Sequence, residues 1–453
     1  MVLIATFAAH FIAMKILKFG GTSVGKPDRM KSLVDLVCTN QPKIVVLSAL
    51  SGSTDALVNI CNLLHNHQKE TAQNAIGELQ VHYKKFIETL FGDNVEAAKE
   101  TTKIIKSHFK YLHDFTLDMF TWNEEKAILA QGELMSTTIF YRYILSIGKK
   151  ASFLNALDFM RTDKDGEPDY FYIKNNLSNE IKRLDNKDLI ITQGYICRNV
   201  YGEIDNLRRG GSDYSASLIG AAVDAEEIQI WTDIDGMHNN DPRVVEQTKP
   251  IRQISFNEAA ELAYFGAKIL HPSSIRPAQE KNIPVLLKNT LNPADEGTKI
   301  TSESESNQIK AIAAKDGITA VKIRSGRMLL AYGFLRKVFE IFERYKTSID
   351  MITTSEVAVS VTIDDLSNIE AIEEELKNYG AVEVDQNLSI VCIVGDFLED
   401  KHGFAHKIFG ALQEIPIRMI SYGGSKNNVS LLIESKYKKE ALTLLNKHIF
   451  GLN

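Results

Sequence analysis

KILKFGGTSVGK (residues 15–26) joins a short apolar run to a glycine-rich turn, and Pro27 follows it. The apolar run predicts a buried strand, and the glycines let the backbone after it come close to a phosphate. A helix that begins near Pro27 would point N–H groups at anionic oxygens. Gly20 to Lys26 also fits the spacing of a P-loop, but Pro27 stands where a P-loop needs Ser or Thr for magnesium, so we reject a P-loop NTPase. A plain tight turn is the alternative interpretation of the Gly-Gly pair.

The first two-thirds of the chain alternates apolar runs with longer amphipathic stretches. Runs rich in Val, Ile and Leu, which are typical of strands covered on both faces, occur at 15–19, 43–50, 188–196, 228–232 and 283–287. Helical patterns occur at 69–91, 93–121, 124–147 and 213–225. Strands that alternate with helices predict βαβ units, and therefore an α/β fold with a mainly parallel sheet.

Length and composition limit the alternatives. A chain of 453 residues exceeds one ordinary core, so two or three domains are expected. A net charge of −6 gives no reason to expect nucleic acid or an anionic membrane as partner. The four cysteines are widely spaced and form no metal-binding pattern, which predicts reduced thiols in a cytoplasmic protein. Residues 1–13 are apolar but lack the basic start of a signal peptide and are too short to span a bilayer, so we expect a dispensable extension.

The tail contains an internal repeat. GFLRKVFEIFERYKTSIDMI (333–352) aligns with GFAHKIFGALQEIPIRMI (403–420), and an alternating strand pattern follows each copy. We interpret the repeat as two βαββαβ modules, each with a helix that begins at Gly-Phe. The predicted boundaries are an extension at 1–13, a first domain at 14–295, a polar linker at 296–309 and the tandem modules at 310–453.

Two further stretches carry groups suited to a phosphorylated ligand. RRGGSD (208–213) opens a helix, with Arg209 suited to a carboxylate or phosphate and Asp213 to Mg²⁺; a helix N-cap is the alternative. WTDIDGMHNNDPR (231–243) follows an apolar strand, where open α/β sheets bind ligands, and a plain turn is the alternative. We interpret His238 in this loop as a stacking or solvent-facing residue, because no second metal ligand lies at the required spacing.

QGELMST (131–137) places a carboxylate in apolar surroundings. Glu133 lies among Gly, Leu and Met on a helical pattern. Burial of a carboxylate costs several kcal/mol unless a cation meets it, so a bound ammonium group is a reasonable partner. A surface glutamate on a helix is the alternative.

Six blocks, taken in order, resemble the aspartokinase branch of the amino-acid kinase family from about Met14 to the end of the chain. The blocks are KFGGTS, VVLSALSG, GELMST, RRGGSD, TDIDG with NDPR, and EAAELAYFGAKILHP. The resemblance implies an amino-acid-kinase-type α/β sandwich with a mainly parallel sheet, followed by two ferredoxin-like ACT modules.

The resemblance also implies a role for individual residues. Lys18 and Asp213 would be catalytic, and Asp213 would bind the metal. The residues implied for the nucleotide are Lys18, Phe19, Gly20, Gly21, Thr232, Asp233, His238, Arg243 and Lys268. The residues implied for aspartate are Ser48, Thr54, Glu133, Arg209, Gly210, Gly211 and Ser212, with Glu133 on the α-ammonium and Arg209 on the α-carboxylate.

The implied reaction transfers the γ-phosphoryl group of ATP to the β-carboxylate of L-aspartate, with Mg²⁺, and gives 4-phospho-L-aspartate. This is the first step of lysine, threonine and methionine biosynthesis. A carboxylate nucleophile is ionised at pH 7, so no general base is required and none stands out in the motifs. Catalysis then depends on positioning and on neutralisation of charge.

The tail resembles ACT modules that bind amino acids at their interfaces. RMLLAYGFL and SIDMITTSEV are similar to the segments that form a lysine pocket in lysine-inhibited relatives. The implied effector contacts are Met328, Phe334, Leu335, Asp350, Ser355 and Glu356, with module folding and dimer packing as the alternative. We expect a homodimer or homotetramer formed through these modules.

Four departures from the family pattern bear on these implications. Arg208 stands where a glycine is typical, Ile204 to Asn206 replace the common threonines, His238 replaces a tyrosine and Ala331 replaces a serine of lysine-sensing relatives. Two other functions stay open: an amino-acid-sensing protein with a silent kinase domain, and a kinase for another small carboxylate such as N-acetylglutamate. The latter leaves the duplicated tail and Glu133 unexplained, because an acylated amine carries no positive charge.

Overall fold

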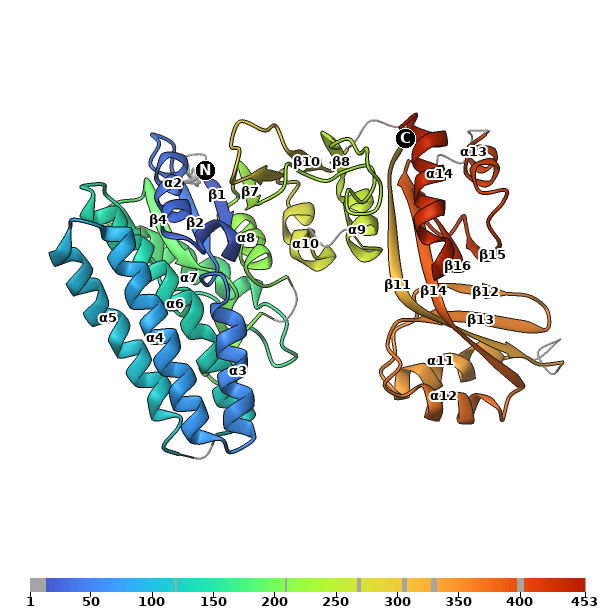
Figure 1. Cartoon of the computed structure of the whole chain (residues 1–453), viewed down its shortest axis with the longest axis horizontal. Helices are drawn as coiled ribbons and strands as arrows, with labels where there is room; N and C mark the ends of the chain where they lie inside the picture. The colour runs from blue at the N-terminus through green and yellow to red at the C-terminus, as the bar shows by residue number, and fades with distance from the viewer. Residues whose placement is uncertain are drawn as a thin grey trace, which may run out of the picture. The chain divides into compact units, whose positions relative to one another are not determined.

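Two units make up the structure, a computed structural model that describes residues 14–118, 120–207, 210–266, 270–303, 308–326, 332–396 and 403–452. Unit 1 comprises Met1–Gly236 and Leu270–Ser302, and unit 2 comprises Met237–Ile269 and Glu303–Asn453 (Figure 1). The segment 237–269 belongs to unit 2, whereas the first domain predicted from the sequence, 14–295, includes it. Packing is the reason, because Val245 is buried in the same core as Leu442 and Leu445 near the end of the chain.

Unit 1 is built on a sheet with the strand order β3-β4-β2-β1-β7-β9-β10. Neighbouring strands from β3 to β9 are parallel, and β10 pairs antiparallel with β9. Strands β2 and β4 are buried along their whole length, as a sheet covered on both faces requires. The strands, which confirm the five predicted ones, are β1 (Lys15–Phe19), β2 (Lys43–Leu47), β3 (Ser152–Phe153), β4 (Leu189–Gln193), β7 (Glu227–Thr232), β9 (Val285–Asn289) and β10 (Thr298–Thr301).

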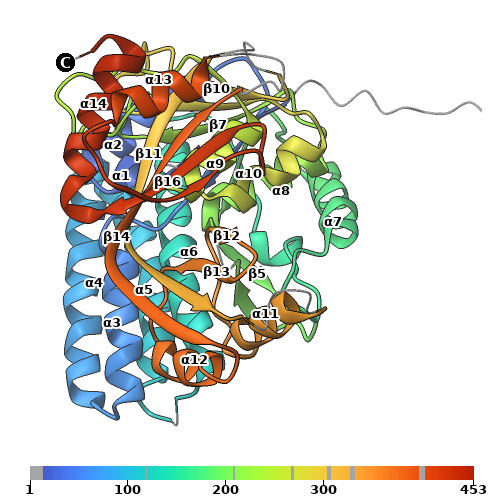
Figure 2. The ribbon, with the colours of Figure 1, turned by 90° about the vertical axis from the view of Figure 1, so that its right-hand side faces the viewer.

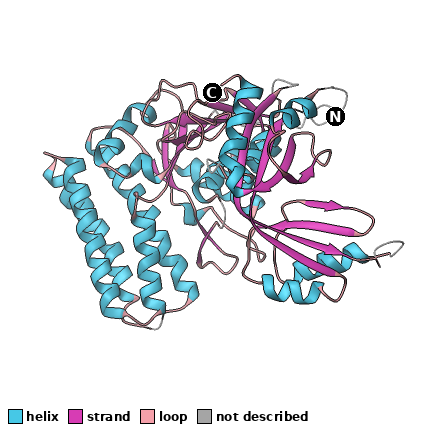
Figure 3. Cartoon of the chain, turned by 45° about the vertical axis from the view of Figure 1, so that its right-hand side comes forward, coloured by secondary structure: helices cyan, strands magenta, loops and turns pink. Residues whose placement is uncertain are grey.

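Four long helices of unit 1 form a bundle in which α3 packs on α4, α4 on α5, α5 on α6 and α6 on α3 (Figure 3). Apolar residues from this bundle and from one face of the sheet share one core. The helices and small strands of unit 1 are α1 (Gly21–Val24), α2 (Pro27–Val37), α3 (Ser53–His65), α4 (Lys69–Phe91), α5 (Val95–Asp114), α6 (Trp122–Ser146), α7 (Tyr170–Arg183), α8 (Gly211–Ala222), α10 (Pro272–Glu280), β5 (Ile196–Arg198) and β6 (Ile204–Asn206). The four predicted helical patterns are confirmed as α4, α5, α6 and α8.

Unit 2 contains an antiparallel sheet with the order β12-β13-β11-β14-β16-β15. Two copies of a βαββα pattern form it, and the first strands of the copies, β11 and β14, pair with each other. Helices α11 and α12 lie at one end of this sheet, and α13 and α14 at the other (Figures 1 and 2). The elements of unit 2 are β8 (Gln253–Ser255), α9 (Phe256–Tyr264), β11 (Ile309–Arg324), α11 (Phe334–Arg344), β12 (Ile352–Thr354), β13 (Ala358–Ile363), α12 (Ile369–Leu376), β14 (Ala381–Gly395), α13 (Phe404–Ala411), β15 (Ile417–Ser421), β16 (Asn428–Glu434) and α14 (Lys438–Phe450).

The predicted internal repeat is confirmed by the two helix starts. Gly333 and Gly403 precede α11 and α13 with φ angles of 81° and 100°, a conformation that glycine adopts without strain. Each copy has its own apolar core, one around α11 and α12 and one around α13 and α14.

Two other expectations concern membrane-spanning helices and the cysteine thiols. Within the described ranges, no helix combines the length and the apolar character needed to cross a membrane. Cys38, Cys61, Cys197 and Cys392 are all free, as predicted.

Candidate active site

The predicted phosphate turn lies where several parallel strands end. Strand β1 is flanked by β2 and β7, with Phe19 opposite Leu47 on one side and opposite Trp231 on the other. Because these strands are parallel, the residues that follow them, among them Gly20 and Ser48, meet at one edge of the sheet. The structure therefore brings the first and third predicted motifs to the same edge, where Thr232 ends β7.

Close backbone packing explains the glycines of the turn. A side chain on Gly21 would place its Cβ 3.2 Å from the Ala49 carbonyl oxygen, and one on Gly25 would place it 2.4 Å from the Ser51 Cβ. The turn after β1 is thus pressed against the loop after β2, which carries Ser48. Only the backbone of Phe19 is available to a ligand, because its side chain is fully buried and stacks on Trp231 with 5.7 Å between ring centroids.

Lys18 and Asp213 form an ion pair at this edge. The Lys18 Nζ lies 2.7 Å from the Asp213 Oδ1, and the two side chains are 12% and 17% exposed. Lys18 comes from β1 and Asp213 from the first turn of α8. Gly210 precedes α8 with a φ of 75°, and a Cβ there would lie 2.8 Å from the Ser274 Cβ, so only glycine fits this helix start. The pair places a cation and a carboxylate side by side in a partly enclosed position.

Glu133 is buried, as its apolar surroundings predict. Glu133 lies on α6 and is 5% exposed. Its Oε1 accepts a hydrogen bond of 3.2 Å from the Ala49 backbone N–H. Gly132 allows this approach, because a Cβ there would lie 2.9 Å from the Ala49 Cβ. Burial raises the pKa of Glu133 to about 8, although the Ala49 N–H and the Lys18 charge act in the opposite direction. Without a bound cation, this carboxyl group therefore holds its proton at neutral pH.

Hydroxyl groups connect some of the residues predicted to bind the substrate. Ser48 Oγ donates to Ser212 Oγ over 2.9 Å, and Ser136 Oγ donates to the Ser48 carbonyl over 2.7 Å. Thr54 is exposed on the first turn of α3. Ser48 and Ser212, predicted from separate motifs, are thus in direct contact.

Sequence reasoning missed Tyr195 beside the predicted site. Its φ of 66° is rare for a residue with a side chain, and its N–H donates to Ser215 Oγ over 2.8 Å. Burial and the nearby Glu133 charge raise the pKa of Tyr195 to about 12. The sequence gives only a weak signal for this residue, because a left-handed Tyr cannot be recognised from composition.

The predicted nucleotide residues lie in two units. In unit 1, Thr232 Oγ1 donates to Asp233 Oδ1 over 3.2 Å. In unit 2, His238 Nδ1 is 2.7 Å from Thr248 Oγ1, and the Arg243 guanidinium donates to both carboxylate oxygens of Asp241 over 2.9 and 2.8 Å. These hydrogen bonds raise the pKa of Arg243 and hold that of Asp241 below its usual range.

Some predicted residues lie outside the part of the chain that the structure describes. They are Arg209, Lys268 and Met328, together with the departures Arg208 and Ala331. Among the residues that are described, no three His, Cys, Asp or Glu side chains gather as a metal cluster. A single carboxylate such as Asp213 is compatible with Mg²⁺, since this ion needs only one or two protein carboxylates when phosphates supply other ligands.

Asp350, which is predicted to contact an effector, already has charged and polar partners in unit 2. Its side chain is 1% exposed, and its Oδ1 lies 2.8 Å from Lys315 Nζ and 2.6 Å from the Tyr264 hydroxyl that donates to it. Asp364 Oδ2 lies 2.9 Å from the same ammonium. Burial lowers the pKa of Lys315, but its hydrogen bonds to Asp350 and Asp364 outweigh this and raise it overall. The protein itself thus supplies a cation for Asp350.

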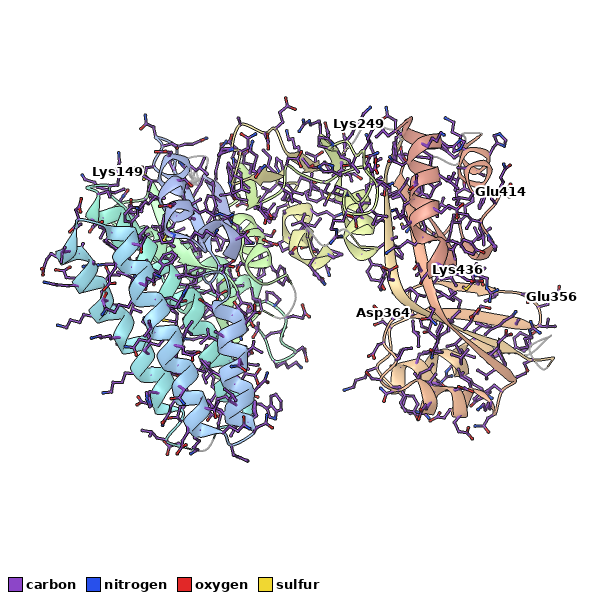
Figure 4. All side chains as sticks on the ribbon, in the orientation of Figure 1. Lys149, Lys249, Glu356, Asp364, Glu414 and Lys436 are labelled. Atoms are coloured by element: carbon purple, nitrogen blue, oxygen red, sulfur yellow. The ribbon has the colours of Figure 1, made fainter. Side chains whose placement is uncertain are left out.

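The other described effector residues are spread over the first module. Phe334 belongs to the apolar core, and Leu335 is 38% exposed beside it at the start of α11. Ser355 and Glu356 are exposed at the turn between β12 and β13, where the Ser355 N–H donates to the Ala358 carbonyl over 2.8 Å. Figure 4 shows Glu356 at the tip of this hairpin and Asp364 at the opposite end of β13.

Comparison with known proteins gives consistent matches along the chain. Residues 13–289 match the amino acid kinase family and residues 391–449 match the ACT domain. Lysine-sensitive aspartokinase 3 of Escherichia coli is 33% identical over 448 residues, which cover 96% of this chain and 99% of that protein. The structure of E. coli aspartokinase III in complex with aspartate and ADP has a TM-score of 0.80 at 32% identity, and covers 96% of this chain and 100% of its own. The structure of the same enzyme in complex with lysine and aspartate has a TM-score of 0.78 at 33% identity, with 96% and 99% covered.

Proposed function

This chain belongs to the aspartokinases of the amino acid kinase family, and we propose that it transfers the γ-phosphoryl group of ATP to L-aspartate through the residues gathered at the end of β1. It is an aspartate kinase. The observation that carries the site assignment is the Lys18–Asp213 ion pair at the edge of the parallel sheet, in electrostatic reach of the buried Glu133. A cation for phosphoryl oxygens and a carboxylate for an ammonium group are thus present in one site.

The chemistry follows from these charges. The β-carboxylate of aspartate is ionised at neutral pH, so it attacks the γ-phosphorus while the bond to ADP breaks, and no proton needs to be moved. Lys18 stabilises negative charge on the transferring group, and the backbone of Gly20 and Gly21 allows close approach of the phosphates. Mg²⁺, when bound, would offset the remaining phosphate charge, and Asp213 is the carboxylate suited to hold it.

Glu133 selects the amino group of the substrate. An ionised Glu133 paired with the α-ammonium replaces the buried neutral acid by an ion pair, which an N-acylated substrate cannot do. Ser48 is linked to the helix of Glu133 through Ser136 and forms a hydroxyl pair with Ser212. We assign Ser48 and Ser212, with Thr54 and Arg209 to Gly211, to aspartate. The same reasoning argues against the N-acetylglutamate kinase alternative.

The nucleotide assignment rests on the resemblance of these segments to the aspartokinases and on the related structures. We assign Thr232, Asp233, His238, Arg243 and Lys268 to ATP, together with the turn after β1. The ADP and aspartate bound in the E. coli enzyme support this choice of ligands.

Regulation by an amino acid is the second part of the proposal. The first module carries the residues that we assign to an effector, and lysine is the candidate because the E. coli relative is lysine-sensitive. We propose that the modules also mediate association into a homodimer or homotetramer, and that the enzyme acts in the cytoplasm at the first step of lysine, threonine and methionine biosynthesis.

The test is formation of aspartyl hydroxamate from L-aspartate, ATP and Mg²⁺ in hydroxylamine, which traps the acyl phosphate. Lys18→Ala should lower the rate about 10²- to 10³-fold, because it removes the cation at the reacting phosphoryl group. Lys15→Ala is the matched control, since Lys15 lies on the same strand and pairs with Glu227 at 2.8 Å instead. Suppression by lysine would support the effector assignment, and activity insensitive to lysine would remove it. Binding of ATP and aspartate without any hydroxamate would favour the silent sensor.

A further inference from the structure

The loop that carries His238 and Arg243 is folded onto the C-terminal helix. Backbone hydrogen bonds join the two ends of this loop, residues 237–251. The Ile251 N–H donates to the Met237 carbonyl over 2.7 Å, and the Asn239 N–H donates to the Lys249 carbonyl over 2.9 Å. Val245, two residues after Arg243, is 4% exposed in the core that α13 and α14 share. The loop is therefore held in unit 2 both at its paired ends and at Val245.

Asn446 on α14 connects both sides of this loop. Its Oδ1 accepts hydrogen bonds from the side-chain amides of Asn239 at 3.3 Å and Asn240 at 3.4 Å. Its Nδ2 donates to the Gln247 carbonyl over 2.9 Å and to the Leu452 carbonyl over 3.4 Å. One amide thus binds the loop before and after Arg243.

The burial of this amide is costly unless its hydrogen bonds are made. Asn446 is fully buried, and its neighbours on the inner face of α14, Ala441, Leu442 and Leu445, are apolar. Asparagine is a poor helix former, and a leucine would extend the apolar face. The polar residue is explained by the loop that it holds, since a half-satisfied buried amide would destabilise the unit.

The hydrogen bonds of Asn446 affect Arg243, which we assign to the nucleotide, through the backbone of the loop. Asn240 also donates to the Leu442 carbonyl over 3.1 Å, and Asp241, the next residue, orients the Arg243 guanidinium through two hydrogen bonds. Fixing residues 239–240 and 247 therefore fixes the segment that presents Arg243 and its carboxylate partner. Loss of these anchors leaves the guanidinium–carboxylate pair intact but frees the segment to move.

We propose that Asn446 is a positioning residue for ATP, which holds the 237–251 loop in the conformation that binds the nucleotide. The inference rests on the proposed nucleotide role of His238 and Arg243. It assigns to the last helix of the second module a part in substrate binding, through contacts within unit 2 alone.

The decisive experiment compares substrate constants of Asn446→Leu with those of the wild-type enzyme. Leucine removes the acceptor of Asn239 and Asn240 and the donor to Gln247, so the KM for ATP and the Kd for ADP should rise at least about ten-fold, because hydrogen bonds on both sides of Arg243 are lost. The KM for aspartate should stay within about two-fold, because Glu133 and its neighbours lie in unit 1. Ile433→Ala is the matched control: Ile433 is fully buried in the same core but makes no hydrogen bond to the loop among the described residues.

Asn240→Ala cuts the same contact from the loop side and leaves α14 unchanged, so it serves if Asn446→Leu does not fold. The double variant should raise the KM for ATP by less than the product of the two single effects, because the Asn240–Asn446 hydrogen bond is lost in both single variants. An unchanged KM for ATP in folded variants would overturn the inference, and so would an equal rise in Ile433→Ala at the same loss of Tm. Absence of hydroxamate formation and ADP binding in the wild-type enzyme would instead overturn the proposed function itself.

Discussion

Replacement of Glu133 by glutamine offers a quantitative test of how aspartate is bound. The pKa of the carboxyl group is raised to about 8 by burial, so at pH 7 about nine molecules in ten carry a protonated Glu133. Binding of the α-ammonium requires the ionised form. The Kd for aspartate should therefore rise about five-fold from pH 8 to pH 7 and about nine-fold from pH 7 to pH 6, or about fifty-fold over the two units.

Calorimetry in buffers of different ionisation enthalpy measures this linkage directly. At pH 7 the wild-type enzyme should release about 0.9 proton for each aspartate bound, because Glu133 ionises on binding. Glu133→Gln keeps the acceptor for the Ala49 N–H but cannot ionise. It should bind aspartate weakly, with a Kd that does not depend on pH over this range and with no proton release.

Stability gives a second measurement with its own sign. Because the folded pKa of Glu133 lies above the ordinary value of 4.5, the folded state keeps a proton that the unfolded state loses between these values. The free energy of unfolding should therefore fall as pH rises from 4.5 towards 8, by about 5 kcal/mol in total for this group. The wild-type enzyme should lose about 1 kcal/mol more than Glu133→Gln between pH 7 and pH 9. The same pH dependence in both proteins, or proton uptake on aspartate binding, would refute the assignment.

Two further changes test the packing around the site and the ion pair of unit 2. Gly194→Ala should lower the free energy of unfolding by about 1–3 kcal/mol in thermal denaturation, because its Cβ would lie 2.4 Å from the Ser212 Cβ; Gly77→Ala, with nothing within 4 Å of its Cβ inside α4, should be neutral or stabilising, and equal Tm values would contradict the packing. Lys315→Met should destabilise unit 2 by about 3–5 kcal/mol, because it leaves the buried Asp350 without its cation. Adding Asp350→Asn should restore most of that loss, and a double variant as unstable as Lys315→Met would show that the ion pair is not the cause.

The fold was predictable because its elements are long and regular. The run at 15–19 became β1 with the predicted bounds, and the pattern at 69–91 became α4 with the predicted bounds. The position of the site followed from topology, since Gly20 and Ser48 come directly after parallel strands. Burial of Glu133 followed from the residues around it in the helix.

Other features depend on contacts between distant residues. Asn239 and Asn446 are 207 positions apart, and neither of the two segments carries a pattern that names the other as its partner. The loop at 231–243 reads as one motif, yet its residues divide between units 1 and 2 after Gly236. The left-handed backbone conformation of Tyr195 could not be predicted from the sequence either, because it depends on the hydrogen bond to Ser215 and on packing.

The effector residues of the first module illustrate how geometry narrows a prediction taken from motifs. Asp350 and Ser355 are five positions apart, at the two ends of a segment that includes β12, and five steps of extended chain span at most roughly 16 Å. Asp350 already binds Lys315 and Tyr264. An effector that contacts Asp350 must therefore compete with Lys315 or use the second carboxylate oxygen, which is buried and has no hydrogen-bond partner among the described residues. An effector that contacted Asp350 of one module and Ser355 and Glu356 of a second copy would link the effector proposal to the dimer proposal.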